Sequence, residues 1–155
     1  MEMIYKNATI WYGKAQHYLL PELYRNVKQV KDTYLNATGG VKCGKAELIL
    51  RLQPTESSII YTIRLTAKQG STVVSVYVIE PAIKKHENGK RVPHLYQDSS
   101  LCLYYPPNNE WVYTDSWAVT IVPWTALWLY YYELWQATGK WLGGGIHGKK
   151  NISPA

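Results

Sequence analysis

Residues 93–111 contain the side chains best suited to chemistry. His94 lies eight residues before Cys102, and Trp111 lies nine residues after it. Cys102 stands in a short apolar run, residues 101–105, between polar loops. A cysteine thiolate is a strong nucleophile, and a nearby imidazole can transfer a proton. The pattern predicts a nucleophilic cysteine on a short structured segment, with a buried and inert thiol as the structural alternative.

The second cysteine, Cys43, has no histidine or tryptophan landmark around it. A disulfide between Cys43 and Cys102 is compatible with the sequence. However, no charged stretch followed by an apolar run marks a secretion signal, so we expect reduced thiols and a cytoplasmic protein. No Cys-x-x-Cys pair suggests a metal site, and no apolar run approaches the ~18 residues of a membrane span.

The composition argues against several classes of function. The net charge of +6 comes from scattered lysines and arginines, which favours dispersed surface charge over a nucleic-acid site. No Gly-rich phosphate loop precedes a helix, and no Gly-x-Ser-x-Gly motif is present. We therefore expect no cofactor, no self-adenylation and no serine hydrolase. Seven Trp and fourteen Tyr residues, with no Phe, suit half-buried clefts and interfaces.

An N-terminal helix is predicted from Pro21, because proline suits a first helical turn. Apolar residues recur at helical spacing beyond it: Leu23, Val27, Val30 and Tyr34. Residues 36–40 are expected to end the helix, since their two glycines can adopt left-handed angles.

Alternation of apolar and polar residues predicts strands at residues 47–52, 58–68 and 72–80. Short turn sequences separate them, so they should form an antiparallel meander. Pro81 ends the third strand, and residues 101–105 form a further short extended piece.

A second helix, rich in Trp and Tyr, is predicted from Pro123 to Gly139. Its apolar face follows helical spacing and should lie in the core: Trp124, Leu127, Trp128, Tyr131, Leu134 and Trp135. The opposite face should carry the other positions: Thr125, Tyr132, Glu133 and Gln136.

These elements predict an α+β fold. An antiparallel β-meander of about four strands is flanked by the N-terminal helix and the C-terminal Trp/Tyr-rich helix. A chain of 155 residues fits one domain. We expect this domain to span residues 1–142, followed by a Gly-rich and basic tail over residues 143–155.

The order of the landmarks resembles the ubiquitin-conjugating (UBC) fold over roughly residues 20–142. A helix, a meander, Pro81, His94, a Leu-Cys-Leu segment around Cys102, Trp111 and an aromatic helix follow one another in that order. The aromatic C-terminal pattern resembles compact bacterial UBC-like proteins encoded in antiphage operons, such as cyclic-oligonucleotide-based signalling systems (CBASS).

The resemblance implies acyl transfer. Cys102 would carry a protein C-terminus as a thioester and pass it to a target amine. The implied partners are a cGAS-like nucleotidyltransferase or another ubiquitin-like C-terminus, and a target protein. A separate activating enzyme is a further candidate partner, because the chain lacks an ATP site of its own. No membrane and no nucleic acid is expected as a partner.

The eukaryotic motif His-Pro-Asn reads His94-Leu95-Tyr96 here, so the asparagine that steadies the oxyanion is absent. His94 is expected either to hold the active-site loop through backbone hydrogen bonds or to donate to the oxyanion. The residue that assists Cys102 in place of the asparagine stays open.

Three further residues are candidates to assist Cys102. Asp98 and Asp115 could orient or deprotonate an incoming lysine, although aspartates in loops more often stabilise turns. His147 lies in the Gly-rich tail, which could fold back toward the cysteine.

Two other functions compete with conjugation. A UBC-like module without catalytic activity could use aromatic clefts to hold a partner protein, and the missing asparagine favours it. A basic protein rich in Tyr and Trp could instead stack on nucleic-acid bases, but the helical spacing of the tryptophans opposes this.

Overall fold

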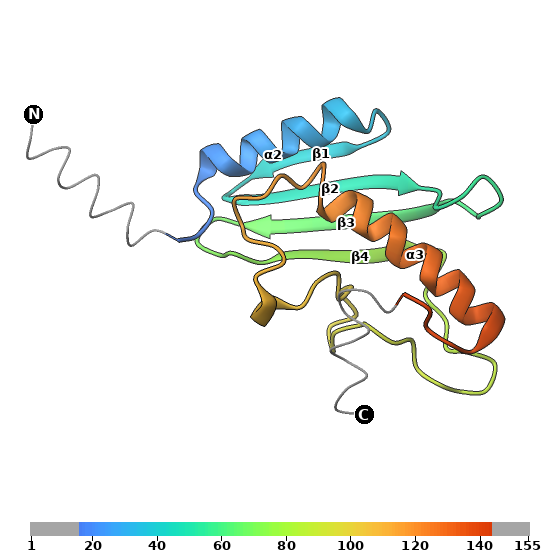
Figure 1. Ribbon diagram of the computed structural model, residues 1–155. Coiled ribbons are helices and arrows are strands. Elements are labelled where there is room, and N and C mark those ends of the chain that lie inside the picture. The colour runs from blue at the N-terminus through green and yellow to red at the C-terminus, as the bar shows by residue number, and fades with distance from the viewer. Residues whose placement is uncertain (1–15, 144–155) are drawn as a thin grey trace, which may run out of the picture.

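The computed structural model describes residues 16–143. A helix, a four-stranded sheet and a second long helix follow in order (Figure 1). Their bounds are α2 (Leu20–Thr33), β1 (Thr38–Lys42), β2 (Lys45–Leu52), β3 (Tyr61–Lys68), β4 (Val74–Glu80), the 3-10 turn η1 (Pro106–Asn108) and α3 (Ile121–Thr138). The predicted α+β fold is confirmed. The single domain over residues 1–142 and the tail over residues 143–155 stay predictions.

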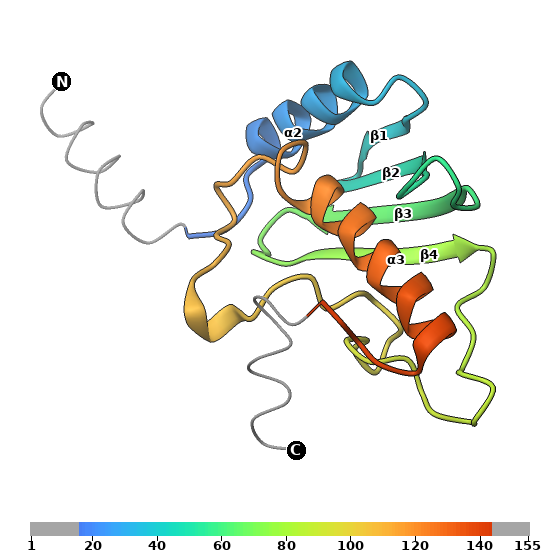
Figure 2. The ribbon, with the colours of Figure 1, turned by 45° about the vertical axis from the view of Figure 1, so that its right-hand side comes forward.

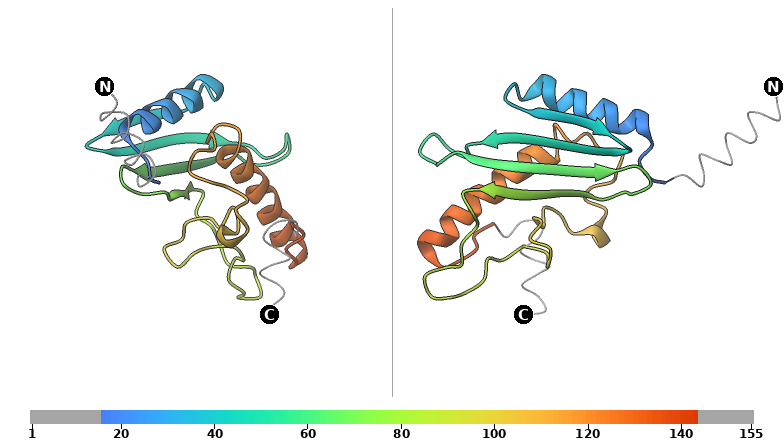
Figure 3. Two further views of the ribbon diagram at one scale, coloured as in Figure 1. Left: turned by 60° about the vertical axis from the view of Figure 1, so that its left-hand side comes forward. Right: turned by 180° about the vertical axis from the view of Figure 1, so that it is seen from behind.

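The strands pair antiparallel in the order β1-β2-β3-β4. Both helices lie on one face of the sheet, and α3 runs obliquely across it (Figures 2 and 3). Alternate side chains of β2 and β3 are therefore buried beneath the helices, as the period of two predicts. Buried on this face are Leu48, Leu50, Leu52, Tyr61, Ile63 and Leu65.

Strand β1 was not expected, because residues 36–40 were interpreted as the end of the helix. The helix ends earlier, at Thr33, and Gly39 and Gly40 form part of the strand. Gly39 has a φ of 121°, and a Cβ there would overlap the Glu47 carbonyl oxygen on β2. Here the glycine permits close strand pairing instead of ending a helix.

The start of β3 also differs from the prediction. Residues 58–60 belong to the loop between β2 and β3, and the strand begins at Tyr61. The Gln53 side chain donates a 2.8 Å hydrogen bond to the Ser58 carbonyl oxygen and so holds the loop. Ile59 and Ile60 are both 55% exposed, and their apolar character misled the prediction.

The buried face of α3 is rotated from the predicted one. Thr125 and Tyr132 were assigned to the outer face, yet both are buried, whereas Leu127 is 49% exposed. The Thr125 hydroxyl donates to the Ile121 carbonyl oxygen, and the Tyr132 hydroxyl accepts a hydrogen bond from the Lys84 amide. Because their hydroxyls have partners, these side chains can be buried at little cost. Trp128 and Trp135 are buried, as predicted.

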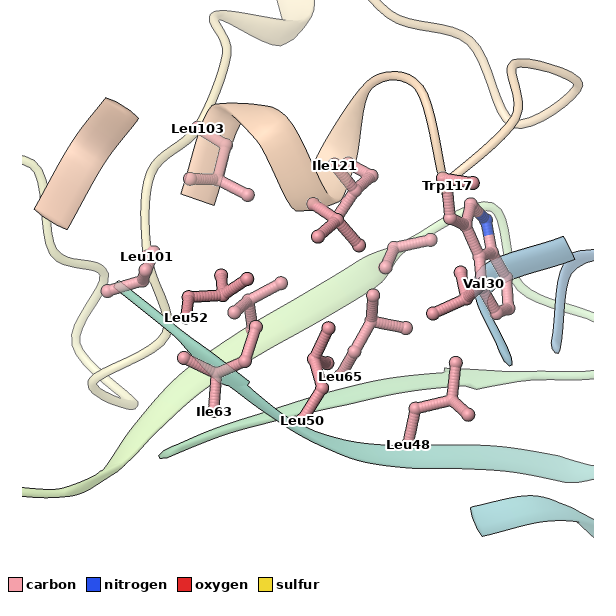
Figure 4. Packing of buried hydrophobic residues seen from close by; sticks show 14 of the residues in the cluster. Val30, Leu48, Leu50, Leu52, Ile63, Leu65, Leu101, Leu103, Trp117 and Ile121 are labelled. Carbon is pink, nitrogen blue, oxygen red and sulfur yellow. The ribbon is translucent and has the colours of Figure 1, made fainter. Parts of the chain in front are cut away.

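The core lies between the sheet and the two helices (Figure 4). The long segment before α3 enters it through Trp117, which is fully buried. Its indole donates a 2.8 Å hydrogen bond to the Tyr18 hydroxyl, and its amide donates to the buried Asn26 of α2. These bonds fasten the connection between the cysteine segment and α3 to the N-terminal helix.

Candidate active site around Cys102

A short hairpin carries Cys102. Leu95 pairs antiparallel with Leu101, and the Cys102 amide donates a 2.9 Å hydrogen bond to the His94 carbonyl oxygen. This register sets His94 opposite Cys102 and Tyr96 opposite Ser100. The eight-residue spacing between His94 and Cys102 thus arises because the two residues pair across a hairpin with a tight turn.

The hairpin is attached to the outer edge of β4. The Leu101 amide donates a 2.9 Å hydrogen bond to the Val76 carbonyl oxygen. Leu101 and Leu103 are buried in the core cluster (Figure 4), whereas Cys102 between them is half-buried. Because side chains alternate along an extended segment, the two leucines fix the backbone and turn the thiol away from the core.

Two tyrosines contact the thiol. The Cys102 Sγ donates a 3.7 Å hydrogen bond to the Tyr104 carbonyl oxygen. A second hydrogen bond joins the Tyr96 hydroxyl to the Cys102 side chain. Cys102 and Cys43 are both thiols, not a disulfide.

The environment of Cys102 raises the pKa of its thiol. Burial is the largest cause, and the negative charge of Glu110 acts in the same direction. The hydrogen bond from Tyr96 opposes both, because a donor stabilises the thiolate. The resting site therefore holds a protonated thiol at neutral pH, and ionisation depends on these neighbours.

His94 contacts its neighbours through both its backbone and its ring. Its carbonyl oxygen accepts hydrogen bonds from the Cys102 amide and from the Trp128 indole, at 2.9 and 3.1 Å. Its imidazole packs against Trp141, with ring centroids 4.9 Å apart. The φ of 57° at His94 is left-handed, a conformation that histidine adopts more readily than most residues. His94 thereby joins the hairpin to α3 and to the segment that follows it.

Asp98 stabilises the hairpin turn. One carboxylate oxygen accepts hydrogen bonds from the Ser100 amide and hydroxyl, and the other accepts one from the Tyr77 hydroxyl. The bonds from Ser100 are the largest cause of a lowered pKa for this carboxyl. Both features suit the turn role that the sequence left open, and a lowered pKa makes a weaker base.

Asp115 closes a turn beyond Trp111, where its carboxylate accepts a 2.9 Å hydrogen bond from the Val112 amide. Trp111 is buried, and its indole donates to the Thr120 hydroxyl. His147 lies outside the described residues.

A cavity of about 620 Å³ adjoins the hairpin. Its floor is largely apolar, from Val73 and Val74 of the β4 side and from Leu103. Tyr96 and Tyr104, which contact Cys102, both line it. The cavity therefore offers an apolar surface next to the residues on either side of the thiol.

The sequence interpretation missed Tyr104 and Glu110, and it did not assign a role to Tyr96. Tyr104 lies two residues beyond Cys102, and side chains two positions apart in an extended segment share one face. That spacing is the one signal in the sequence that could have identified it. Glu110 is brought near by the η1 turn, where its carboxylate accepts hydrogen bonds from the Tyr105 amide and the Asn108 side chain.

Fold and site together define a class, the small α+β proteins that present a half-buried cysteine on a hairpin beside a four-stranded antiparallel meander. Comparison with protein families narrows this class. The family model of the Type II CBASS E2 protein matches residues 26–148, a range that includes Cys102, and the chain belongs to this family. No curated protein matches the sequence.

Membership of the family gives the protein an E2-like role in CBASS defence, with partners encoded in the same operon. Over residues 16–143, no helix has both the length and the apolar character needed to cross a membrane. Within the same range, no three His, Cys, Asp or Glu residues are grouped to hold a metal ion.

Proposed function

We propose that the protein is an acyl-transfer enzyme that carries a protein C-terminus as a thioester on Cys102 and passes it to a target amine. In CBASS the acyl donor would be the cGAS-like nucleotidyltransferase. One observation carries the proposal: Cys102 is a half-buried thiol that two leucines hold outward, within a hairpin fixed to both the sheet and α3.

Two steps make up the reaction. First, the Cys102 thiol gives up its proton to water and the sulfur attacks an activated carbonyl carbon. A carbon–sulfur bond forms, and the former leaving group departs with its electron pair. Next, the target amine attacks the thioester, forms the carbon–nitrogen bond, loses a proton to water and expels the Cys102 thiolate. The sequence has no Gly-rich phosphate loop before a helix, so the donor would reach Cys102 already activated.

The other cysteine supplies a matched comparison. Cys43 is exposed in the β1–β2 turn, with a φ of 50°. A thiol in that position has none of the neighbours that shape Cys102. It therefore serves as the control in a test of which cysteine is acylated.

The test uses a synthetic thioester of the nucleotidyltransferase's C-terminal peptide, which removes the need for an activating enzyme. We expect the protein to form one adduct that reductant and hydroxylamine remove. Cys102→Ala should abolish it, and Cys43→Ser should leave it unchanged. In cells, Cys102→Ala should also abolish conjugation and defence against phage.

The opposite results have a clear meaning. Normal defence and an unchanged, tight complex of Cys102→Ala with the nucleotidyltransferase would overturn the proposal. They would favour a UBC-like module that binds its partner without catalysis.

A further inference from the structure

We propose that the Tyr96 phenol is the hydrogen-bond donor that stabilises the oxyanion when an amine attacks the thioester on Cys102. The inference rests on the proposed function, and it assigns to one residue the role that the absent asparagine leaves open.

The contacts of the thiol indicate the direction of each hydrogen bond. The Tyr104 carbonyl oxygen accepts a hydrogen bond from the Cys102 Sγ at 3.7 Å. In the register of the Leu95–Leu101 bridge, Tyr96 and Cys102 lie on the same face of the hairpin. Their hydrogen bond raises the pKa of the phenol and lowers that of the thiol, as expected when the phenol donates to the sulfur. Acylation removes the thiol proton but leaves the phenol proton in place.

The hairpin holds the phenol in position before any acyl group arrives. The Tyr96 amide donates to the Ser100 carbonyl oxygen at 2.9 Å, and the Ser99 amide donates to the Tyr96 carbonyl oxygen at 3.0 Å. Both bonds lie beside the Leu95–Leu101 bridge, which fixes the register. A donor held in this way loses little entropy when charge develops nearby.

The position of the ring suits an acyl oxygen. Tyr96 is 45% exposed and lines the cavity beside Cys102, so it is accessible from the solvent side of the sulfur. The carbonyl oxygen of an acyl group on Sγ lies only two bonds from the sulfur. A small rotation of the phenol transfers its hydrogen bond from the sulfur to that oxygen.

Tyr96 stays a donor throughout the physiological pH range. Burial is the largest cause of its raised pKa, and the hydrogen bond to Cys102 acts in the same direction. A raised pKa keeps the hydroxyl protonated, as an oxyanion donor requires.

The step balances as follows. The amine nitrogen attacks the carbonyl carbon and forms the C–N bond, and the carbonyl electron pair moves to oxygen, where the phenol donates to it. The oxyanion then collapses and the C–S bond breaks. The Cys102 thiolate leaves with the electron pair, and the ammonium loses its proton to solvent water.

Tyr96→Phe tests the inference, because it removes only a hydroxyl from a half-exposed ring. The protein is first charged with the peptide thioester, and its discharge to free lysine is followed in a single turnover. We expect discharge about 100-fold slower, the usual effect of removing one oxyanion donor. Tyr105→Phe is the matched control, because the contact of Tyr105 with Glu110 is made by its amide and not by its hydroxyl.

A second measurement separates the hydroxyl from a general structural effect. In the uncharged protein, Tyr96→Phe should move the pH profile of Cys102 alkylation by iodoacetamide to higher pH, with an unchanged melting temperature. A discharge rate equal to that of the unaltered protein would overturn the role of Tyr96 and leave the thioester mechanism intact. Absence of any adduct on Cys102 in the unaltered protein would overturn both proposals.

Discussion

Two polar neighbours act on the Cys102 thiol in opposite directions. The Tyr96 hydroxyl stabilises the thiolate through a hydrogen bond, whereas the Glu110 carboxylate destabilises it by charge repulsion. Burial adds to the effect of Glu110, so the pKa of the thiol is raised overall. A raised pKa lowers the thiolate fraction at neutral pH, and so limits reaction of the thiol with electrophiles.

Glu110→Gln should make the thiol more reactive. Loss of the negative charge lowers the pKa of Cys102 and increases its thiolate fraction at neutral pH. We expect alkylation by iodoacetamide at pH 7 to be faster by roughly a factor of two to five, as is typical of one partly screened charge. The pH profile of alkylation should move to lower pH.

The control for this change is Glu56→Gln, in the distant loop between β2 and β3. It removes the same charge from the protein and should leave the alkylation rate unchanged. Equal rates for Glu110→Gln and the unaltered protein would show that the carboxylate does not act on the thiol.

Individual site residues could be predicted only where their type is informative. Cys102 and His94 attract attention because few side chains perform their chemistry. Tyr96 and Glu110 are ordinary residue types in this chain, and their positions depend on the hairpin register and on the η1 turn. Neither contact can be derived from local sequence.

At the scale of elements, α3 and the cysteine hairpin form one unit. The His94 carbonyl oxygen accepts hydrogen bonds from the Trp128 indole of α3 and from the Cys102 amide. The helix thus sets the position of the backbone that carries Cys102. A carbonyl oxygen with two donors is well satisfied, and loss of one donor in a half-buried site is costly.

Trp128→Phe should loosen this unit while keeping most of the aromatic packing. We expect the free energy of unfolding to fall by about 1–3 kcal/mol, from the lost hydrogen bond and the smaller ring. Amide hydrogen exchange at Cys102 should become faster, because its acceptor is held less firmly. Denaturant unfolding and exchange measurements check both expectations.

Tyr130→Phe is the comparison within the same helix, since Tyr130 is 37% exposed. It should change neither the unfolding free energy nor the exchange at Cys102 appreciably. If Trp128→Phe leaves exchange at Cys102 as slow as before, the helix does not position the hairpin.

The elements were predictable where a simple period applies. Alternation in residues 47–52 located the core of β2, and helical spacing located α2 and α3. β1 was not predicted, because two adjacent glycines more often end a helix or strand than form part of one. The predicted orientation of α3 was wrong because Thr125 and Tyr132 carry polar hydroxyls and were therefore expected to face solvent. Both hydroxyls instead form hydrogen bonds within the protein.

At the scale of the whole molecule, Trp141 connects the end of the described chain to the site. Its ring lies 4.9 Å from that of His94, 5.3 Å from that of Trp128 and 6.3 Å from that of Tyr131. The predicted boundary between domain and tail at residue 142 follows directly after this aromatic cluster. If the domain ends just after this cluster, truncation before Trp141 should destabilise the fold and truncation after it should not.

A chain that ends after Gly143 should unfold with the same free energy as the complete chain. A chain that ends after Lys140 lacks Trp141 and should lose about 2 kcal/mol or more, from aromatic contacts and apolar burial. Thermal unfolding of the two truncated proteins makes the comparison. Equal stability of both would place the domain boundary before Trp141.

The chain that ends after Gly143 also tests His147. If His147 assists Cys102, this protein should keep its stability and its acylation but transfer the acyl group more slowly. His147→Ala in the complete chain should then show the same defect. Unchanged transfer in both would exclude His147 from the reaction.

The bond between the Leu101 amide and the Val76 carbonyl oxygen has a consequence for self-association. β4 is an outer strand of the sheet, and exposed strand edges invite other chains to pair and aggregate. The hairpin that carries Cys102 covers part of this edge, so one segment both presents the thiol and shields the sheet. Sequence changes near Cys102 must therefore also keep this edge covered, which restricts how freely the loop can vary.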